Sequence, residues 1–285
     1  MRDGRNPNHY NVPCPPVPGV SLCVVTHCPD DSFYHAQHFQ VVRLCIDSMI
    51  RGASGKASEL IIWDNGSTRD FRDMLRNRYS DYLSGGTLIE SPNIGPHNAR
   101  RALCAIARGK YINLSDDDIL YSPDWLDKQY QIMQTYPNVA VVSGSPINIE
   151  FRRNWKPAHE FAAKNKGEVT KVTGFSFIPE QWESDWCYSI GKKPEGHKPT
   201  QQETYLEYKG IKAWAQAHHM QMLCPRDTIA PFLKPTKNLV DFWDIADEIS
   251  KAGYLQLSTF ERTALHIGNV IDPSIERIVR EWQKR

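Results

Sequence analysis

Residues 110–123 read K-Y-I-N-L-S-D-D-D-I-L-Y-S-P, and the rest of the chain is best understood from this stretch outward. Its apolar part, Tyr111–Leu114, predicts a buried strand ending at Ser115, and Asp116, Asp117 and Asp118 follow directly. Three adjacent carboxylates repel one another, so they favour a place where a positive charge lies. Mg²⁺ and Mn²⁺ prefer carboxylate oxygens, and Mg²⁺ is often held by one or two carboxylates plus substrate phosphates. The stretch therefore predicts a metal–diphosphate site, with a solvated acidic turn as the alternative.

Length, charge and cysteine content limit the class of protein. The 285 residues suffice for one large domain or two small ones, and the net charge of +1 argues against bulk electrostatic binding of nucleic acid. No apolar run reaches the ~20 residues of a transmembrane helix, and the N-terminus lacks the apolar region of a signal peptide. The seven cysteines are scattered without a C-x-x-C pair. They indicate a reducing cytoplasm and argue against a zinc site, and we expect Cys23, Cys45 and Cys104 to be core thiols.

Predicted strands and helices alternate over the first half of the chain. Short apolar runs predict strands at Ser21–Cys28, Leu60–Trp63, Thr87–Glu90, Lys110–Ser115 and Asn138–Ser143. Between them, apolar residues recur every three or four positions, which is typical of helices. This order predicts an α/β fold, Rossmann-like, with a mostly parallel central sheet flanked by helices.

Polar residues stand where four of these strands end. They are Thr26/His27, Asp64/Asn65, Asn93 and the three aspartates. The carboxyl ends of parallel strands lie along one edge of a sheet, so these residues predict a pocket for a polar, phosphorylated ligand. A P-loop and a G-x-G-x-x-G loop are both missing, which disfavours NTPases of that class and dinucleotide-dependent oxidoreductases. Diphosphate charge would then be met by a metal ion, by Arg100 or Arg101, or by amides starting the helix at 97–108.

The second half of the chain has weaker periodicity. Strands are predicted at 168–173, 213–223, 255–258 and 263–267, and a loop at 188–204. Residues 239–252 carry one apolar stripe and predict a helix, and a basic amphipathic helix starts at Pro273. We expect that last helix to pack on the domain, with contact to a membrane surface as the alternative.

The four strand-end segments resemble, in order and spacing, family 2 glycosyltransferases of the GT-A fold. The matching segments are V-V-T-H-C, W-D-N-G-S-T-R-D, P-N-I-G-P-H-N-A-R-R and Y-I-N-L-S-D-D-D-I-L-Y-S-P, within residues 20–145. The resemblance implies a nucleotide-diphosphate sugar donor, UDP- or another, and Mn²⁺ or Mg²⁺. It implies that Asp64 faces the base, that Thr26 lines that pocket and that Asn93 and Arg100 lie near it. Asp116 would approach the ribose and Asp117 would bind the metal.

One residue departs from the family pattern. Ser115 stands where many members have an aspartate. This leaves open which two of Asp116, Asp117 and Asp118 form the D-x-D pair; Asp117 and Asp118 are the metal ligands we expect.

The second half resembles the family more loosely. D-F-W-D-I-A-D-E-I-S-K-A-G-Y is similar to its acidic helix, which implies Asp241, or else Asp244, as the base for the acceptor hydroxyl. The alternative for both is a solvated helix face. His266 matches a metal or phosphate ligand of some members, with a core histidine as the alternative. Trp155, Trp182, Trp186 and Trp214 are candidates for stacking on an acceptor sugar or for core positions, and His218 and His219 are predicted to point to opposite faces of a strand.

These observations and the resemblance predict a metal-dependent glycosyltransferase without a transmembrane segment, located in the cytoplasm with peripheral membrane contact left open. That the reaction inverts the configuration is implied by the resemblance alone. The acceptor, whether a glycan, a lipid-linked molecule or a protein, is not identified by the sequence. We expect an irregular arm at 1–19, a donor half at 20–150, a smaller mixed acceptor half at 151–272 and a C-terminal helix at 273–285. The alternatives are a sugar nucleotidyltransferase and a non-catalytic nucleotide-sugar-binding protein.

Overall fold

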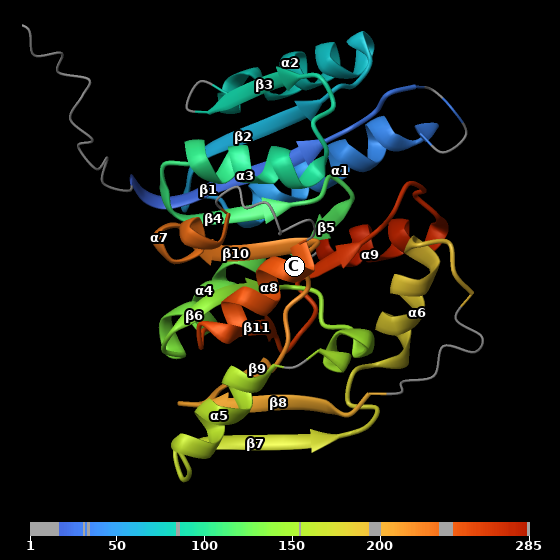
Figure 1. Cartoon of the computed structure of the whole chain (residues 1–285). Helices are drawn as coiled ribbons and strands as arrows, with labels where there is room; N and C mark the ends of the chain where they lie inside the picture. The colour runs from blue at the N-terminus through green and yellow to red at the C-terminus, as the bar shows by residue number, and fades with distance from the viewer. Residues whose placement is uncertain are drawn as a thin grey trace, which may run out of the picture.

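One large sheet forms the centre of the molecule (Figure 1). The computed structural model describes residues 17–30, 32, 35–83, 86–153, 155–193, 201–233 and 242–283, and within them ten strands pair in the order β3-β2-β1-β4-β10-β6-β11-β9-β8-β7. The sheet is parallel through its first four strands and mixed beyond them. This is the division between a parallel first half and a mixed second half that the sequence predicts.

The parallel part consists of β1 (Val17–Thr26), β2 (Ala57–Asn65), β3 (Thr87–Ser91) and β4 (Gly109–Ser115). They are joined by α1 (His38–Gly52), α2 (Arg69–Leu83) and α3 (Pro96–Ile106). Register pairs Thr26 with Asp64, and Asp64 with Glu90, at the carboxyl ends of three neighbouring strands. Val24 pairs with Ser115, so the aspartates leave β4 at the same edge. The predicted convergence of strand ends is thus confirmed.

Helices cover both faces of this parallel part. On one face, Val42, Cys45 and Ile46 of α1 pack with Leu22 and Val24 of β1 in a fully buried cluster. On the other face, Ala99 and Leu103 of α3 pack with a second set of strand side chains, Cys23, Ile61 and Leu114. Burial of one such aliphatic side chain contributes roughly 1.5–3 kcal/mol, so the two layers fix the edge on which the polar residues stand.

The second half builds the other side of the sheet. Its strands are β6 (Val139–Ser143), β7 (Val169–Gly174), β8 (Glu203–Tyr208), β9 (Ile211–Trp214), β10 (Gln221–Pro225) and β11 (Leu255–Thr259). Two further strands, β5 (Ile119–Tyr121) and β12 (Ala264–His266), pair with each other beside the aspartates. The helices are α4 (Trp125–Thr135), η3 (Asn148–Arg152), α5 (Lys156–Lys164), α6 (Glu180–Ser189), α7 (Arg226–Ile229), η4 (Ala230–Leu233), α8 (Phe242–Lys251) and α9 (Pro273–Gln283).

Several predictions for this half need correction. The strand predicted at 213–223 is two strands, β9 and β10, because residues 215–220 leave the sheet between them. Helix α6 occupies the start of the loop predicted at 188–204 and was not predicted, whereas the strand at 168–173 is confirmed as β7. Trp155 and Trp214 are 4% and 2% exposed, so both fill the core and neither is available to stack on a sugar.

Helix α9 packs back onto the domain. Its residues Ile275, Ile278 and Trp282 are buried against Val41, Leu120, Leu265 and Ile267. Across the described residues no helix combines the length and the apolar character needed to cross a bilayer. Within the described residues the six cysteines form no disulfide bond and are buried, which confirms Cys23, Cys45 and Cys104 as core thiols. The cytoplasmic location stays a prediction.

Candidate active site

The ends of β1 and β2 form a buried polar floor. Thr26 is fully buried and its hydroxyl donates to the carbonyl oxygen of Trp63 over 3.4 Å. Asp64 is fully buried beside it and accepts a hydrogen bond from the backbone N–H of Ser67 at 3.2 Å. Burial raises the pKa of Asp64 above its ordinary value, although Ser67 opposes the shift. The structure thus brings together the two residues that the family resemblance assigns to one pocket.

Asparagines connect the ends of β2 and β3. The side-chain amide of Asn65 donates to Oδ1 of Asn93 at 3.0 Å, and its own Oδ1 accepts from the N–H of Ile94 at 2.9 Å. Nδ1 of His27 lies 2.9 Å from the carbonyl oxygen of Asn65. His27 and Asn65 stood at predicted strand ends but had no assigned role. The network shows that they hold Asn93 in place.

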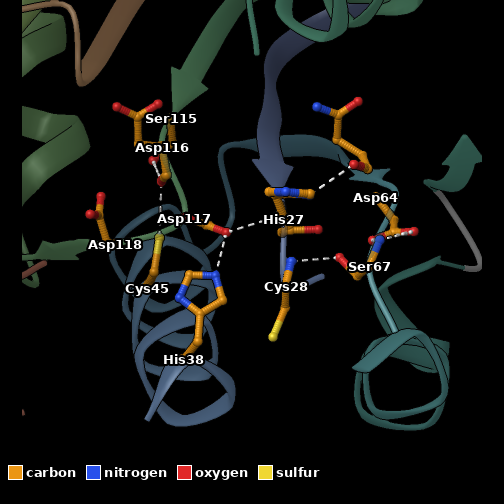
Figure 2. Close-up of polar contacts among 12 residues, drawn as sticks. His27, Cys28, His38, Cys45, Asp64, Ser67, Ser115, Asp116, Asp117 and Asp118 are labelled. Carbon is orange, nitrogen blue, oxygen red and sulfur yellow. Dashed lines mark hydrogen bonds and ion pairs between the residues drawn. The ribbon is translucent and has the colours of Figure 1, made fainter. Parts of the chain in front are cut away.

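The three aspartates point toward three different neighbours. Asp116 forms an ion pair with the buried Arg100 of α3. Asp117 faces the end of β1 and the start of α1 (Figure 2). Asp118 faces β12, where its Oδ2 lies 2.9 Å from Nε2 of His266. The acidic stretch is therefore not a solvated turn, because each carboxylate has a specific partner.

Asp117 is held by two nitrogen atoms. Its Oδ2 accepts from the backbone N–H of His27 at 3.2 Å, and Nε2 of His38 lies 3.1 Å from the same oxygen (Figure 2). His38 is the first residue of α1, is buried, and stacks on Phe71. His38 is not among the site residues predicted from the sequence, because no local pattern marks it and its partner lies 79 positions away.

Asp118 and His266 form a buried acid–base pair. Burial alone would raise the pKa of Asp118, but the positive charge of His266 and then that of His38 lower it overall. Burial would likewise lower the pKa of His266, yet the charge and hydrogen bond of Asp118 raise it overall. Nδ1 of His266 lies 2.7 Å from the hydroxyl of Ser189 in α6, which fixes the ring.

Asp117, Asp118 and His266 carry donor atoms of the kinds that bind divalent metal ions. Within the described residues no three His, Cys, Asp or Glu side chains converge as a ready set of metal ligands. The donor chemistry does suit one: Oδ1 of Asp118 is buried and has no hydrogen-bond partner in the described part of the chain. Asp117 is adjacent in sequence and His266 is in contact, and carboxylate oxygens with an imidazole nitrogen are acceptable ligands for such ions.

Of the two residues expected to act as the base, the structure describes one. Asp241 lies outside the described residues. Asp244 is half-buried in the first turn of α8, whose buried Ile245 and Ile249 pack onto the sheet. Helix α8 precedes β11, and β11 runs parallel to β6. The helix therefore begins over the carboxyl ends of these strands.

The structure contradicts the prediction that His218 and His219 point to opposite faces of a strand. They lie in the segment between β9 and β10 and not in a strand, and their rings stack at 4.5 Å between centroids. Nε2 of His218 lies 3.6 Å from Oε1 of the buried Glu150. Burial lowers the pKa of His219 to about 3, and the positive charge of Arg100 adds to the shift. Both rings are therefore neutral at pH 7.

Comparison with known proteins gives one matching family and many similar solved structures, of which two are described here. A model of Glycosyl transferase family 2 matches residues 32–253. The mannosyltransferase PcManGT from Pyrobaculum calidifontis, solved with GDP-Man and Mn²⁺, is 15% identical with a TM-score of 0.51, over 85% of this chain and 54% of that one. TarS 1-349 from S. aureus is 17% identical with a TM-score of 0.37, over 47% of this chain and 40% of that one. No curated protein sequence matches. The likeness to the mannosyltransferase shows a GT-A fold, and the chain spans about half of that protein's length.

Proposed function

The chain belongs to glycosyl transferase family 2 and is a glycosyltransferase, and we propose that it transfers a sugar from a nucleoside-diphosphate donor to an acceptor hydroxyl with a divalent metal ion. The observation that carries the proposal is that Asp117 and Asp118, the latter 2.9 Å from His266, stand at the sheet edge that also holds Asp64. Family membership favours glycosyl transfer over nucleotidyl transfer and over a purely binding role.

The nucleoside lies over the ends of β1, β2 and β3 in this proposal. The buried carboxylate of Asp64 can accept a hydrogen bond from an N–H group of the base. Thr26 closes the floor beside it, and the Asn65–Asn93 network limits the width of the pocket. In this proposal the buried positive charge of Arg100 follows the nucleoside pocket, on the side of the diphosphate.

We assign the metal to Asp117, Asp118 and His266. Asp116 is engaged by Arg100, and the hydroxyl of Ser115 donates to the carbonyl oxygen of Asp116 and accepts from Tyr121. Neither is free to serve as a ligand, so Asp117 and Asp118 are the pair that remains. When bound, the ion would neutralise the charge that develops on the departing diphosphate. The presence of Mn²⁺ beside GDP-Man in the mannosyltransferase supports this assignment.

The proposed reaction is a single displacement. The acceptor oxygen forms a bond to the anomeric carbon from the face opposite the diphosphate, and the bond from that carbon to the diphosphate oxygen breaks. The nucleoside diphosphate leaves with the bonding electron pair, and Asp241 or Asp244 takes the hydroxyl proton. The configuration at the anomeric carbon is therefore inverted.

The test is calorimetric titration of GDP and UDP with MnCl₂ or with EDTA, followed by hydrolysis of a panel of nucleotide sugars. We expect metal-dependent binding of one nucleotide in the wild type and its loss in Asp117→Ala. Asp127→Asn is the matched control, because Asp127 is exposed on α4 and away from the site. A wild type that binds neither nucleotide with Mn²⁺ and turns over no nucleotide sugar contradicts the proposal.

A further inference from the structure

A cavity of about 570 Å³ opens beside the Asp118–His266 pair. It lies between the end of α6 and the turn that joins β12 to α9, both on the right of Figure 1. Its volume is within the roughly 300–1,000 Å³ of small-molecule sites. Asp118 and His266 line it directly, so an occupant would lie next to the proposed metal site.

The cavity is separate from the side where the nucleotide would bind. Asp64 and Asn93 stand at the ends of β2 and β3, across β1 from the aspartates. Asp117 faces that side through His27, whereas Asp118 faces the cavity through His266. The acidic stretch therefore faces the proposed nucleotide side in one direction and the cavity in the other, and a transferase with two substrates needs two binding places.

Large apolar side chains form a wall of the cavity. Tyr188 is 59% exposed, Val270 54% and Ile190 37%. They come from two segments far apart in the sequence, yet they border the same space. Exposed apolar groups gathered at one concave place mark a binding surface more often than groups scattered singly. An aromatic ring beside aliphatic groups suits the C–H face of a sugar ring.

The charged groups of the cavity select against anions. Three carboxylates line it, those of Asp118, Asp185 and Asp272. Asp185 is paired with Arg262 at 2.6 Å, and Asp272 accepts from the N–H of Ser274 at 2.8 Å, at the start of α9. With Asp118 paired to His266, an added anion would meet the negative charge of Asp272, which forms no ion pair within the described residues. A neutral ligand with hydroxyl groups avoids that repulsion.

We infer that this cavity is the acceptor site and that it takes a neutral sugar residue, with one face of the sugar on Tyr188 and a hydroxyl directed toward the Asp118–His266 pair. The inference deepens the proposed function and rests on it, because it assigns the second substrate of the same reaction. It excludes acceptors whose sugar bears a carboxylate or a phosphate at this position.

The test uses saturation-transfer NMR with methyl glycosides of neutral hexoses and of uronic acids, on wild type, Tyr188→Ala and Tyr188→Phe. We expect a neutral glycoside to bind the wild type, uronic acid glycosides to bind less, and Tyr188→Ala to weaken binding about tenfold. Tyr188→Phe keeps the ring and so most of the affinity. The control is Phe175→Ala, which removes an aromatic side chain that is 56% exposed outside the cavity.

Nucleotide binding, measured with GDP, UDP and Mn²⁺ on the same variants, separates two kinds of failure. Unchanged glycoside binding in Tyr188→Ala, equal loss in Phe175→Ala, or preferred binding of uronic acid glycosides overturns the acceptor site alone if the wild type still binds a nucleotide. Absence of any glycoside signal from the wild type does the same. Absence of nucleotide binding and of turnover in the wild type overturns the proposed function and the acceptor site together.

Discussion

Nε2 of His38 lies 3.1 Å from Oδ2 of Asp117, so the first residue of α1 reaches the acidic stretch after β4 (Figure 2). The backbone N–H of His27 donates to the same oxygen at 3.2 Å. Within the described residues the other oxygen, Oδ1, accepts no hydrogen bond and can bind a ligand. Groups that orient a metal ligand in this way commonly change metal affinity about 10–100-fold when they are removed. His38 is thus a positioning residue for the proposed metal site.

Replacing His38 should weaken metal binding. We expect His38→Leu to raise the Kd for Mn²⁺ about 10–100-fold, because Oδ2 of Asp117 loses one of its two partners. The Kd is measured by electron paramagnetic resonance of Mn²⁺ without nucleotide. His38→Gln keeps an N–H donor and should recover part of the affinity. A merely structural role would lower the melting temperature in His38→Leu and leave the Kd for Mn²⁺ unchanged.

How far the sequence could predict this site depends on sequence distance. Asp64 and the three aspartates each follow a short apolar strand, so the pattern and the parallel order placed them on one edge correctly. His38 contacts Asp117 only because α1 packs under β1, which no local pattern records. Asp241 has an expected role from resemblance alone.

The second half of the fold was harder to predict for a different reason. Strand β10 lies between β4 and β6 and antiparallel to both, and Gln221 in it contacts Asn113 from 108 positions away. The sequence A-Q-A-H-H-M has the apolar–polar mixture of a strand, yet residues 215–220 leave the sheet. His218 and His219 therefore lie stacked and not on opposite faces. Tertiary contacts therefore decide both the position of β10 in the sheet and the orientation of the two histidines.

The Asp118–His266 pair should give the free energy of unfolding a defined pH dependence in EDTA. His266 has a raised pKa when folded, so its contribution is complete below the unfolded value of 6.5 and is lost as pH rises through the folded value. Asp118 has a lowered pKa, so its contribution is lost as pH falls below the unfolded value of 3.8 through the folded one. Asp118→Asn removes both contributions to the free energy of unfolding.

Between the unfolded values of Asp118 and His266, near pH 5–6, both groups are charged in the wild type. We therefore expect Asp118→Asn to lose most stability, relative to wild type, in this pH range. The difference should shrink as pH rises through the raised folded pKa of His266, because the ring then loses its charge in the wild type as well. Urea titrations at several pH values measure it. Asp127→Asn, at an exposed position, should show no such profile. An equal loss at all pH values would show that the pair is not ionised in the folded protein.

Glu150 should destabilise the fold as pH rises. It is 2% exposed, and burial raises its pKa to about 7 despite the opposing charges of Arg153 and Arg152. The folded state binds a proton more tightly than the unfolded state, so stability falls between the unfolded value of 4.5 and about 7. Glu150→Gln removes this dependence. The loss of unfolding free energy between pH 5 and pH 8 should therefore be roughly 2–3 kcal/mol smaller in Glu150→Gln than in wild type.

A matched variant is available on α5. Glu160 is exposed and belongs to an i,i+4 pair with Lys156, so Glu160→Gln should leave the pH dependence as in wild type. Glu183 is also buried with a pKa raised to about 7, and it will keep part of the slope in Glu150→Gln. If Glu150→Gln keeps the full slope, Glu183, whose pKa is raised in the same direction, must carry the dependence in its place.

Arg100 and Asp116 should behave as a coupled pair in a double-mutant cycle. The guanidinium of Arg100 is buried on α3 and pairs with the partly exposed Asp116. Arg100→Met leaves Asp116 without its ion-pair partner, and Asp116→Asn removes the carboxylate that faces a buried positive charge, which is the larger cost. We expect losses of about 1–3 kcal/mol for Arg100→Met and about 3–5 kcal/mol for Asp116→Asn. The double variant should lose less than their sum, because the neutral amide no longer faces the buried guanidinium. Strict additivity of the three unfolding free energies would mean that the ion pair contributes nothing, and Asp116 would then be available as a metal ligand.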